Sequence, residues 1–403
     1  MYGYNHIVSV QRINMPEKKI ILDENIKIKD LDKSSMYSNL YSIAKDTLKS
    51  YDKAKKDLNI KNNRINNIIG AGMGGAGMPL LALQHLLKDE LNFPYVVSQN
   101  YTLPNFANSN TALIAISQSG KSEEIISQYR QAINKDVKII VIEKEDIFEK
   151  KGTLIKMANN DGIPCFSYSS NVPARASFGF MFGSVLAFLE NIGAISSSKR
   201  EAIFESIGIV EKLNKNIIGI DIPNEDNKAK QIALSLKNQI PVLYVEPPFG
   251  SLGSRFAKMF NENVGMFAFY NYFPELRHNE IMSWIGARNN YNSKFVPILL
   301  RDNKEYSKME EEINEIKEVI ARNVENYSNF IEIRAEGKSK IARFFYLLHY
   351  ADMISYYSAI LIDKDPSDTK DLEELKTKLR TSGCLRTVLN RHLDKEFLSS
   401  TGE

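Results

Sequence analysis

The sequence predicts an α/β protein with two doubly wound halves, each built on a mainly parallel sheet flanked by helices. Short apolar runs alternate with segments of helical spacing along most of the 403 residues, and such alternation is typical of a parallel sheet covered on both faces. This alternation of strands and helices is interrupted near Ser196–Arg200 and then continues, which separates two sets of strands. A chain of this length also exceeds a single ordinary core.

The strands are expected where apolar runs are short and bounded by polar or small residues. The first set comprises Ile65–Ile69, Tyr95–Val97, Ala112–Ile116, Val137–Ile142 and Cys165–Tyr168. The second set comprises Val242–Val245, Met266–Tyr270, Phe295–Leu300 and Phe330–Ile333. A further short strand is expected at Lys19–Leu22, ahead of both sets.

Helices are expected between these strands. Ser34-Ser35 offers an N-cap for a helix whose apolar face contains Leu40, Ile43, Leu48 and Tyr51. Phe178–Leu189 predicts a helix buried inside a domain, because it is too short to span a bilayer. A long helix is expected after Ser196–Arg200, up to about Ile217, and a charged surface helix over Glu305–Asn326. One further helix is broken by Asp365-Pro366, and a final one runs through Leu372, Leu375 and Leu379.

These elements predict four parts of the chain. Residues 1–60 form an N-terminal lead-in and helix, 61–205 the first α/β domain, 206–380 the second, and 381–403 a C-terminal tail.

Composition and charge exclude several classes of protein. The net charge of +3 is small, and Lys and Arg are scattered among Asp and Glu, so no nucleic-acid surface is expected. The two cysteines cannot build a disulfide framework and lack metal-ligand spacing, which favours a reducing, cytoplasmic location. The first residues show no signal peptide, and we expect neither a membrane segment nor a metal.

Two loops of small residues carry the strongest functional signal. Gly70–Gly77 follows the first expected strand, and Ser117–Ser122 follows the third. A strand, a small-residue turn and a helix N-terminus bring backbone N–H groups and a positive helix end to one point. The pair predicts a site for a phosphorylated small molecule, with Glu123 and Glu124 pointing away from the phosphate.

Simpler interpretations of both loops stay open. The glycines could serve close strand–helix packing, and the serines could belong to an ordinary polar turn. A dinucleotide site is also conceivable, although the spacing differs from G-x-G-x-x-G and no acidic residue ends a second strand.

Four further motifs, together with the two loops, resemble the SIS (sugar isomerase) superfamily and, more narrowly, the archaeal-type bifunctional phosphoglucose/phosphomannose isomerases. The motifs are Pro173–Gly179, Asn261-Glu262-Asn263, Pro274–Ile281 and the stretch from Asp352–Tyr357 through Asp365-Pro366 to Leu375-Lys376. The resemblance covers residues 35 to 380. It implies two SIS-type domains and an aldose–ketose isomerase that interconverts fructose 6-phosphate with glucose 6-phosphate and mannose 6-phosphate, without a cofactor.

The resemblance also implies catalytic roles. Glu262 transfers a proton through a cis-enediol, and a carboxylate base of this kind suits the C–H beside a carbonyl. Arg175 stabilises the negative charge that develops on the enediolate. His278 opens the sugar ring, entering the site from the neighbouring subunit of a homodimer, and Lys376 meets the substrate near its ring oxygen. The alternatives are a surface carboxylate for Glu262, a helix cap for His278 and a solvated lysine for Lys376.

Substrate binding is expected from both loops. Gly74, Gly75 and Ala76 offer backbone N–H groups, Ser117, Ser119 and Ser122 offer hydroxyls, and Thr369 is the small hydroxyl residue that would let the enediol rotate. Ala76 departs from the family pattern, which has serine there, and so lacks one phosphate-binding hydroxyl. The loop at Glu246–Gly250 before Arg255 is also less typical, which leaves its sugar contacts open.

Two other functions remain as alternatives. The chain could be a catalytically silent sugar-phosphate sensor that uses the same pocket, as Ala76 and the N-terminal extension suggest. The isomerase half of a glucosamine-forming amidotransferase is disfavoured, because no N-terminal glutaminase segment with a leading cysteine is present.

Overall fold

The computed structural model describes residues 21–58, 64–145, 153–170, 173–195, 198–286, 294–323 and 331–381. The described residues up to Pro366 form one compact unit, and those from Ser367 onward belong to a second. The second unit is described through a single helix, α13 (Lys370–Thr381). The tail from residue 382 lies outside the described residues.

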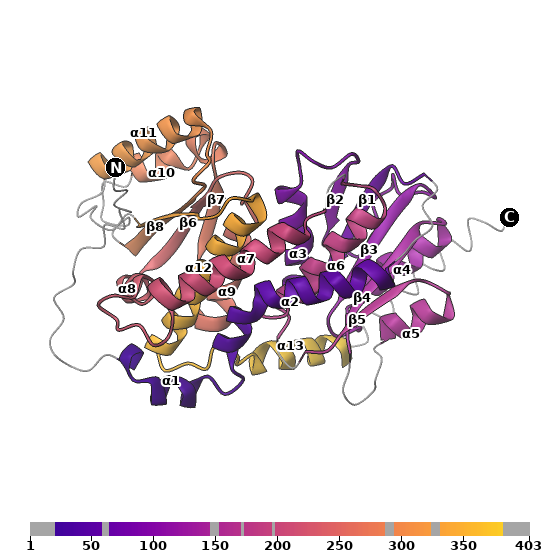
Figure 1. Ribbon diagram of the computed structural model, residues 1–403, viewed down its shortest axis with the longest axis horizontal. Helices are drawn as coiled ribbons and strands as arrows, with labels where there is room; N and C mark the ends of the chain where they lie inside the picture. Colours follow the sequence, from indigo (N-terminus) through magenta and orange to yellow (C-terminus); the bar gives the residue numbers. More distant parts are fainter. Residues whose placement is uncertain are drawn as a thin grey trace. The chain divides into compact units, whose positions relative to one another are not determined.

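The first unit contains two parallel β-sheets (Figure 1). The first sheet has the order β2-β1-β3-β4-β5, and the second has the order β7-β6-β8-β9. The strands of the first are β1 (Asn67–Gly72), β2 (Tyr95–Ser98), β3 (Thr111–Ser117), β4 (Lys138–Lys144) and β5 (Cys165–Tyr168). Those of the second are β6 (Ile240–Val245), β7 (Phe269–Tyr272), β8 (Phe295–Arg301) and β9 (Ile331–Arg334).

The two sheets repeat one topology. In each, the first strand along the chain lies inside the sheet, the second lies at an edge, and the third and fourth follow on the other side. The nine expected strands all fall on strands of the described chain, with ends displaced by no more than three residues. The predicted fold class is therefore confirmed.

Helices flank both sheets and connect the strands. The longer ones are α2 (Met36–Asp57), α3 (Gly74–Leu86), α4 (Glu123–Asn134), α6 (Phe178–Asn191), α7 (Arg200–Leu213), α11 (Ser307–Asn323) and α12 (Lys340–Leu361). The shorter ones are α1 (Asn25–Leu31), α5 (Thr153–Asn160), α8 (Lys228–Ser235), α9 (Ser251–Met259) and α10 (Ile281–Gly286). Single turns are η1 (Ile21–Asp23), η2 (Asn214–Ile218), η3 (Phe260–Val264) and η4 (Glu275–His278).

The N-terminal region differs from the prediction. The described part of the expected strand Lys19–Leu22 is a 3₁₀ turn, η1, and not a strand. Leu22 is fully buried and Asp23 accepts a hydrogen bond from Asn224 N (2.8 Å), so side chains and not a sheet edge hold this turn. The helix α1 that follows was not predicted.

Ser35 holds the N-cap position of α2, as predicted, but another side chain caps the helix. Ser35 adopts a left-handed conformation (φ 55°), and its side chain makes no cap hydrogen bond. Asp32 accepts the first N–H groups instead, from Met36 (2.6 Å) and Tyr37 (2.9 Å). A carboxylate suits this position, because it satisfies two orphan donors and its charge complements the positive end of the helix.

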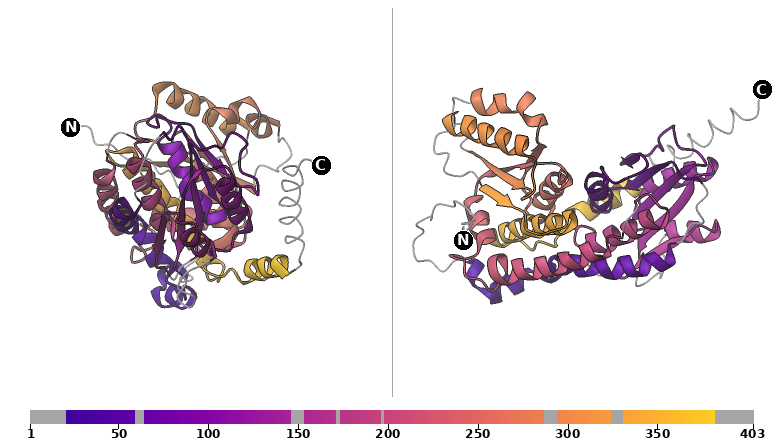
Figure 2. Two further views of the ribbon diagram at one scale, coloured as in Figure 1. Left: turned by 90° about the vertical axis from the view of Figure 1, so that its right-hand side faces the viewer. Right: turned by 45° about the horizontal axis from the view of Figure 1, so that its top comes forward.

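Helix α12 forms the centre of the first unit. Its residues from Ile341 to Ile360 are all buried, and it packs against α2, α7, α8 and α9, while α2 and α7 lie side by side (Figure 2). Most of these side chains are apolar, and a helix with apolar residues around its whole circumference is stable only when it is enclosed in this way. One apolar cluster runs through both halves, and two smaller clusters cover the other faces of the sheets.

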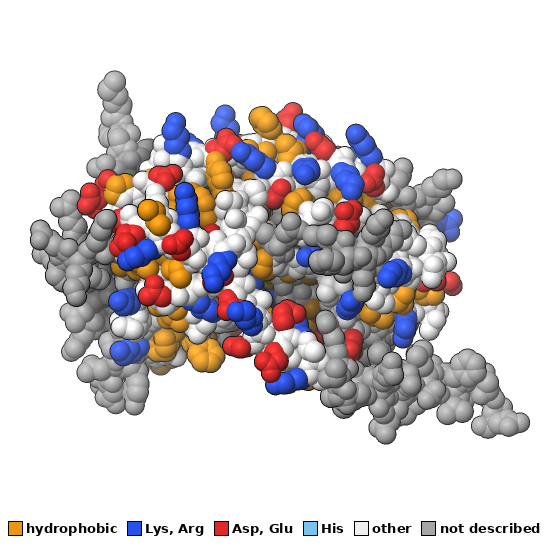
Figure 3. All heavy atoms as spheres, turned by 90° about the horizontal axis from the view of Figure 1, so that it is seen from below, with side chains coloured by type: hydrophobic (Ala, Val, Ile, Leu, Met, Phe, Trp, Pro, Cys, Tyr) orange, Lys and Arg blue, Asp and Glu red, His pale blue; other side chains and the backbone are white. Residues whose placement is uncertain are grey.

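The surface charge is mixed, in keeping with the small net charge of the chain. On the face drawn in Figure 3, acidic and basic side chains are intermingled, with no wide field of one sign. Among the described residues, no helix combines the length and apolar character needed to cross a membrane.

A buried histidine on α12 makes folding stability depend on pH. His349 is 2% exposed, and burial lowers its pKa from 6.5 to about 4. The unfolded chain therefore binds a proton that the folded protein excludes, so the free energy of unfolding falls between pH 6.5 and pH 4, by about 3 kcal/mol for this group. Urea unfolding across this range should show a weaker decline for His349→Gln than for the wild type. Parallel curves for the two proteins would contradict this prediction.

Candidate active site

The two small-residue loops meet at the carboxyl edge of the first sheet. β1 and β3 are parallel neighbours, with Gly72 paired to Ile116. The chain leaves β1 toward β2 on one side, while β3 continues toward β4 on the other. Ligands of open α/β sheets bind at such a topological switch point. The loop after β1 and the loop after β3 therefore flank one position.

The first loop passes directly into α3. The helix begins at Gly74, so the N–H groups of Gly74 and Gly75 lie ahead of its first backbone hydrogen bonds, which start at Ala76 and Gly77. A Cβ on Gly75 would lie 2.9 Å from Arg175 N, so only glycine permits this approach. The N–H of Ala76, which we expected to be available, donates to Met73 O (3.0 Å) and closes the turn. Gly74 and Gly75 are thus the better N–H donors of this loop.

The second loop is held by its own serines. Ser117 Oγ donates to Ser122 Oγ (3.0 Å), and Ser119 Oγ accepts from the N–H of Lys121 (3.2 Å). Gly120 has φ +64°, and a Cβ there would lie 2.6 Å from the Glu143 carboxylate. Glycine is therefore required, and the loop turns tightly into α4.

The turn Pro173–Ser177 connects both loops with the second half of the molecule. Gln118 Nε2 donates to Ser177 Oγ (3.5 Å), which joins the turn to the serine loop. Gly75 packs against Arg175 in the same turn. The turn itself is closed by the N–H of Ser177, which donates to Pro173 O (3.1 Å). Arg175 is consequently placed beside both loops.

Arg175 is buried, with 4% of its surface exposed. Its Nε donates to Asn263 Oδ1 (2.7 Å), Nη1 to Glu262 Oε2 (2.9 Å), and Nη2 to Pro366 O (2.7 Å). Burial lowers the pKa of the guanidinium, and the Glu262 charge counters this shift. A guanidinium has five N–H groups, so these three bonds leave further donors on Nη1 and Nη2 for an anion.

Glu262 belongs to the second half and lies on the π-helical turn η3, at the end of α9. Such turns are frequent at functional sites. Its side chain is 29% exposed, and Lys364 Nζ donates to its backbone carbonyl (3.1 Å). Among the described residues, no hydrogen bond engages Oε1. The carboxylate is thus held by Arg175 on one oxygen while the other can face a ligand.

Buried partners that sequence reasoning did not identify support this pair. Arg255 is bidentate to Asp352 (2.9 and 2.6 Å), and its Nη2 also donates to Arg175 O (3.0 Å). Asn263 Nδ2 donates to Ser355 Oγ (3.1 Å) on α12. Asp352 and Ser355 were visible as a motif, but only the structure shows that they orient Arg255 and Asn263.

The other predicted catalytic residues and Thr369 have partners of their own among the described residues. His278 is exposed at the end of η4, and Arg277 Nε donates to its Nε2 (3.3 Å). Within the described residues, no hydrogen bond or ion pair joins His278 to Arg175 or Glu262. Lys376 pairs with Glu373 (2.6 Å) on α13, and Thr369 O accepts from the N–H of Glu373 (3.0 Å), both within the second unit.

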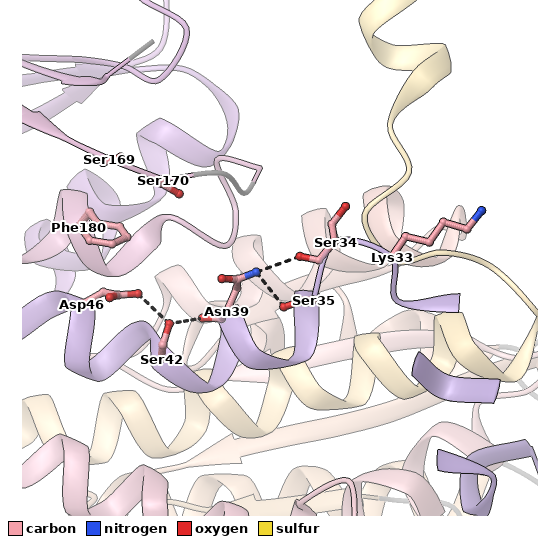
Figure 4. Close-up of a pocket in the computed structure, with 9 residues that line it drawn as sticks. All are labelled: Lys33, Ser34, Ser35, Asn39, Ser42, Asp46, Ser169, Ser170 and Phe180. Atoms are coloured by element: carbon pink, nitrogen blue, oxygen red, sulfur yellow. Dashed lines mark hydrogen bonds between the residues drawn. The ribbon is translucent and has the colours of Figure 1, made fainter. Parts of the chain in front are cut away.

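A polar groove of about 530 Å³ lies elsewhere, along the start of α2 (Figure 4). Its lining consists of Lys33, Ser34, Ser35, Asn39, Ser42, Asp46, Ser169, Ser170 and Phe180. Asn39 Nδ2 donates to the carbonyls of Ser34 and Ser35, and Ser42 donates to Asp46 (Figure 4). None of the predicted site residues lines this groove, so we do not assign the chemistry to it.

Solved structures of other proteins share this fold. A hypothetical protein of Thermus thermophilus aligns with a TM-score of 0.68 and 14% identity, over 90% of this chain and 96% of its own. The C-terminal domain of glucosamine-fructose-6-phosphate aminotransferase from Francisella tularensis aligns with a TM-score of 0.60 and 11% identity, over 83% and 97%. Residues 225–379 match the family described as bacterial phospho-glucose isomerase C-terminal SIS domain. The fold and site thus define an SIS-type protein.

Sequence relatives narrow the class to a family. The bifunctional phosphoglucose/phosphomannose isomerase of Aquifex aeolicus is 30% identical over 78% of this chain and 90% of its own length. The enzymes of the same name from Caldicellulosiruptor bescii and Thermoplasma acidophilum are 28% and 29% identical, over 85% and 81% of this chain and 98% and 94% of their own. The chain belongs to the family of bifunctional phosphoglucose/phosphomannose isomerases.

Proposed function

We propose that this protein is an aldose–ketose isomerase that interconverts fructose 6-phosphate with glucose 6-phosphate and with mannose 6-phosphate. One observation carries the proposal. A carboxylate (Glu262) and a buried cation (Arg175) are paired at 2.9 Å, beside the two loops suited to hold a phosphate. A proton acceptor next to a phosphate anchor is what an enediol mechanism requires, whereas a protein that only binds has no use for a base.

The chemistry assigned to the pair is a proton transfer between adjacent sugar carbons. Glu262 removes the proton from C2 of the open aldose, or from C1 of the ketose, and returns it to the neighbouring carbon of the cis-enediol. Oε1 is the oxygen we assign to this transfer, because Oε2 accepts from Arg175. The remaining N–H groups of Arg175 stabilise the enediolate oxygen as its charge develops.

Substrate binding is assigned to the two loops, and further roles to Thr369 and Lys376. Gly74, Gly75 and Ala76 form the first phosphate loop, although the N–H of Ala76 already donates to Met73. Ser117, Ser119 and Ser122 form the second. We assign Lys376 a contact near the ring oxygen. Thr369 is the small hydroxyl residue that would permit rotation of the enediol, and mannose 6-phosphate turnover that survives in Thr369→Gln would remove that role.

Ring opening is assigned to His278, acting on the site of a second copy in a homodimer. Within about a dozen residues of His278 along the chain, large apolar side chains are exposed on the edge strand β7 and near it, and they support such an interface. They are Phe267 (76% exposed), Phe269 (50%), Tyr270 (39%), Tyr272 (38%) and Met282 (62%). A two-fold dimer formed along this edge would cover such side chains and carry each His278 toward its partner. The reaction and the chain's two cysteines fit a cytoplasmic location.

Mixing two inactive variants tests whether His278 acts in trans. In a heterodimer of Glu262→Gln with His278→Ala, one site carries both changes and the other carries none. Co-refolded or co-expressed mixtures should therefore regain about a quarter of the wild-type rate, because about half of random dimers are heterodimers with one intact site. If His278 acted within its own subunit, every site would still contain one of the two substitutions, and no activity would return.

A coupled assay with fructose 6-phosphate tests the function as a whole. The wild type should form both glucose 6-phosphate and mannose 6-phosphate. Binding of fructose 6-phosphate without turnover would instead favour the sugar-phosphate sensor, which the family relationship does not favour.

A further inference from the structure

Lys258 is a half-buried cation that the proposed mechanism does not use. It lies on α9, one turn before Glu262, and its Nζ donates to Met78 Sδ (3.3 Å). Among the described residues, no carboxylate lies within ion-pair distance of this ammonium. A thioether is a weak hydrogen-bond acceptor, so the charge is poorly compensated.

Burying an ammonium raises the free energy of the folded protein unless an anion lies close to it. Removing an ammonium from water without a partner destabilises its charged form. Burial accordingly lowers the pKa of Lys258, and only the more distant charge of Glu262 opposes the shift. A cation that an anionic ligand would compensate is characteristic of a binding site.

The contact with Met78 places Lys258 beside α3, the helix that begins at the first phosphate loop. Met78 lies three and four residues after Gly75 and Gly74, so the three residues share one face of α3. Gly75 contacts Arg175 on this face. Ser254, one turn before Lys258 on α9, also approaches Met78, with its Oγ 3.9 Å from Sδ. Lys258, Arg175, Glu262 and the first turn of α3 therefore border the same region.

We propose that Lys258 binds the phosphate group of the substrate, and that its charge supplements the neutral donors of the Gly74–Ala76 loop. The proposal rests on the proposed function for the identity of the substrate. Gly74, Gly75 and Ala76 have no side-chain donor, and the Lys258 ammonium lies against the same helix, so it can add a charged donor to their backbone N–H groups. A phosphate contact is made equally in the ground state and the transition state, so it should affect binding and not the chemical step.

The test compares Lys258→Met with Lys258→Arg and with the wild type. Inorganic phosphate is the direct probe, titrated calorimetrically and as a competitive inhibitor. Loss of one charge-assisted hydrogen bond should raise the dissociation constant of phosphate and the KM for fructose 6-phosphate roughly 10- to 100-fold in Lys258→Met, with kcat within a few-fold of the wild type. Lys258→Arg should recover part of the affinity. Lys135→Met, which removes an exposed lysine at the end of α4, should behave as the wild type.

The outcomes separate this proposal from the proposed function. Unchanged phosphate affinity in Lys258→Met overturns the role of Lys258, and so does a loss confined to kcat, which would place the ammonium at the reacting carbons. A wild-type protein that binds phosphate but fails to isomerise fructose 6-phosphate overturns the proposed function, while the difference in phosphate affinity still reports on Lys258. Thermal unfolding of each variant establishes that it is folded at the assay temperature.

Discussion

Replacing Glu262 with glutamine should lower kcat for isomerisation about 10²- to 10⁴-fold, the usual contribution of a positioned base. Glutamine keeps the size of the side chain, and its amide oxygen can still accept from Arg175 Nη1, so the pair should retain its geometry. The neutral amide cannot take the proton. The affinity for inorganic phosphate should therefore stay near that of the wild type, while turnover of fructose 6-phosphate is lost.

The matched control is Glu225→Gln, which removes an exposed carboxylate in the turn before α8. This variant should have wild-type kinetics. Glu262→Asp offers a graded comparison, because it keeps the charge but withdraws it by one methylene. Undiminished kcat in a folded Glu262→Gln protein would show that another group is the base.

Replacing Arg175 with lysine should lower kcat about 10²- to 10³-fold, the range found when one stabilising donor is removed from a developing oxyanion. Lysine keeps the positive charge, but an ammonium cannot reproduce the fork that reaches Asn263 Oδ1, Glu262 Oε2 and Pro366 O together. The chemical step should suffer more than phosphate binding, so the kcat term should carry most of the loss in kcat/KM.

Arg200→Lys is the comparison for this change, since Arg200 forms an exposed bidentate pair with Asp52. Exposed pairs contribute little to stability, so this variant should match the wild type in rate and unfolding midpoint. Arg175→Lys should also show a lower unfolding midpoint, because it leaves buried acceptors without a donor. A folded Arg175→Lys protein with wild-type kcat would refute the stabilising role.

The strands were predictable because parallel strands buried on both faces are near-continuous apolar runs. Cys165–Tyr168 was predicted with the observed ends, and Ala112–Ile116 within one residue of them. The N-terminal region was less predictable, since η1 is held by Asn224, a residue about 200 positions away in the chain. The N-cap position of α2 was predicted, but its capping side chain was not: Ser35 is left-handed, and the Asp32 carboxylate accepts from the first N–H groups of the helix instead.

The site was predicted as a set of residue types and not as a network. The Asn261-Glu262-Asn263 motif identified a candidate base, and the Pro173–Gly179 turn a candidate cation. Neither pattern indicates that Arg175 uses one nitrogen for Glu262 and another for Asn263. Lys258 was not singled out at all, because a lysine on an amphipathic helix has no sequence signal for burial.

The sequence by itself determined the two parallel sheets, the small-residue loops after the first and third strands, and the family to which the chain belongs. These features depend on local composition and spacing, which short-range sterics and hydrogen bonding translate directly into structure. Only the tertiary structure decided that Arg175 and Glu262, 87 residues apart, form one partly buried pair supported by α12. Such a contact depends on how helices pack around a shared core, and no local pattern along the chain encodes that packing.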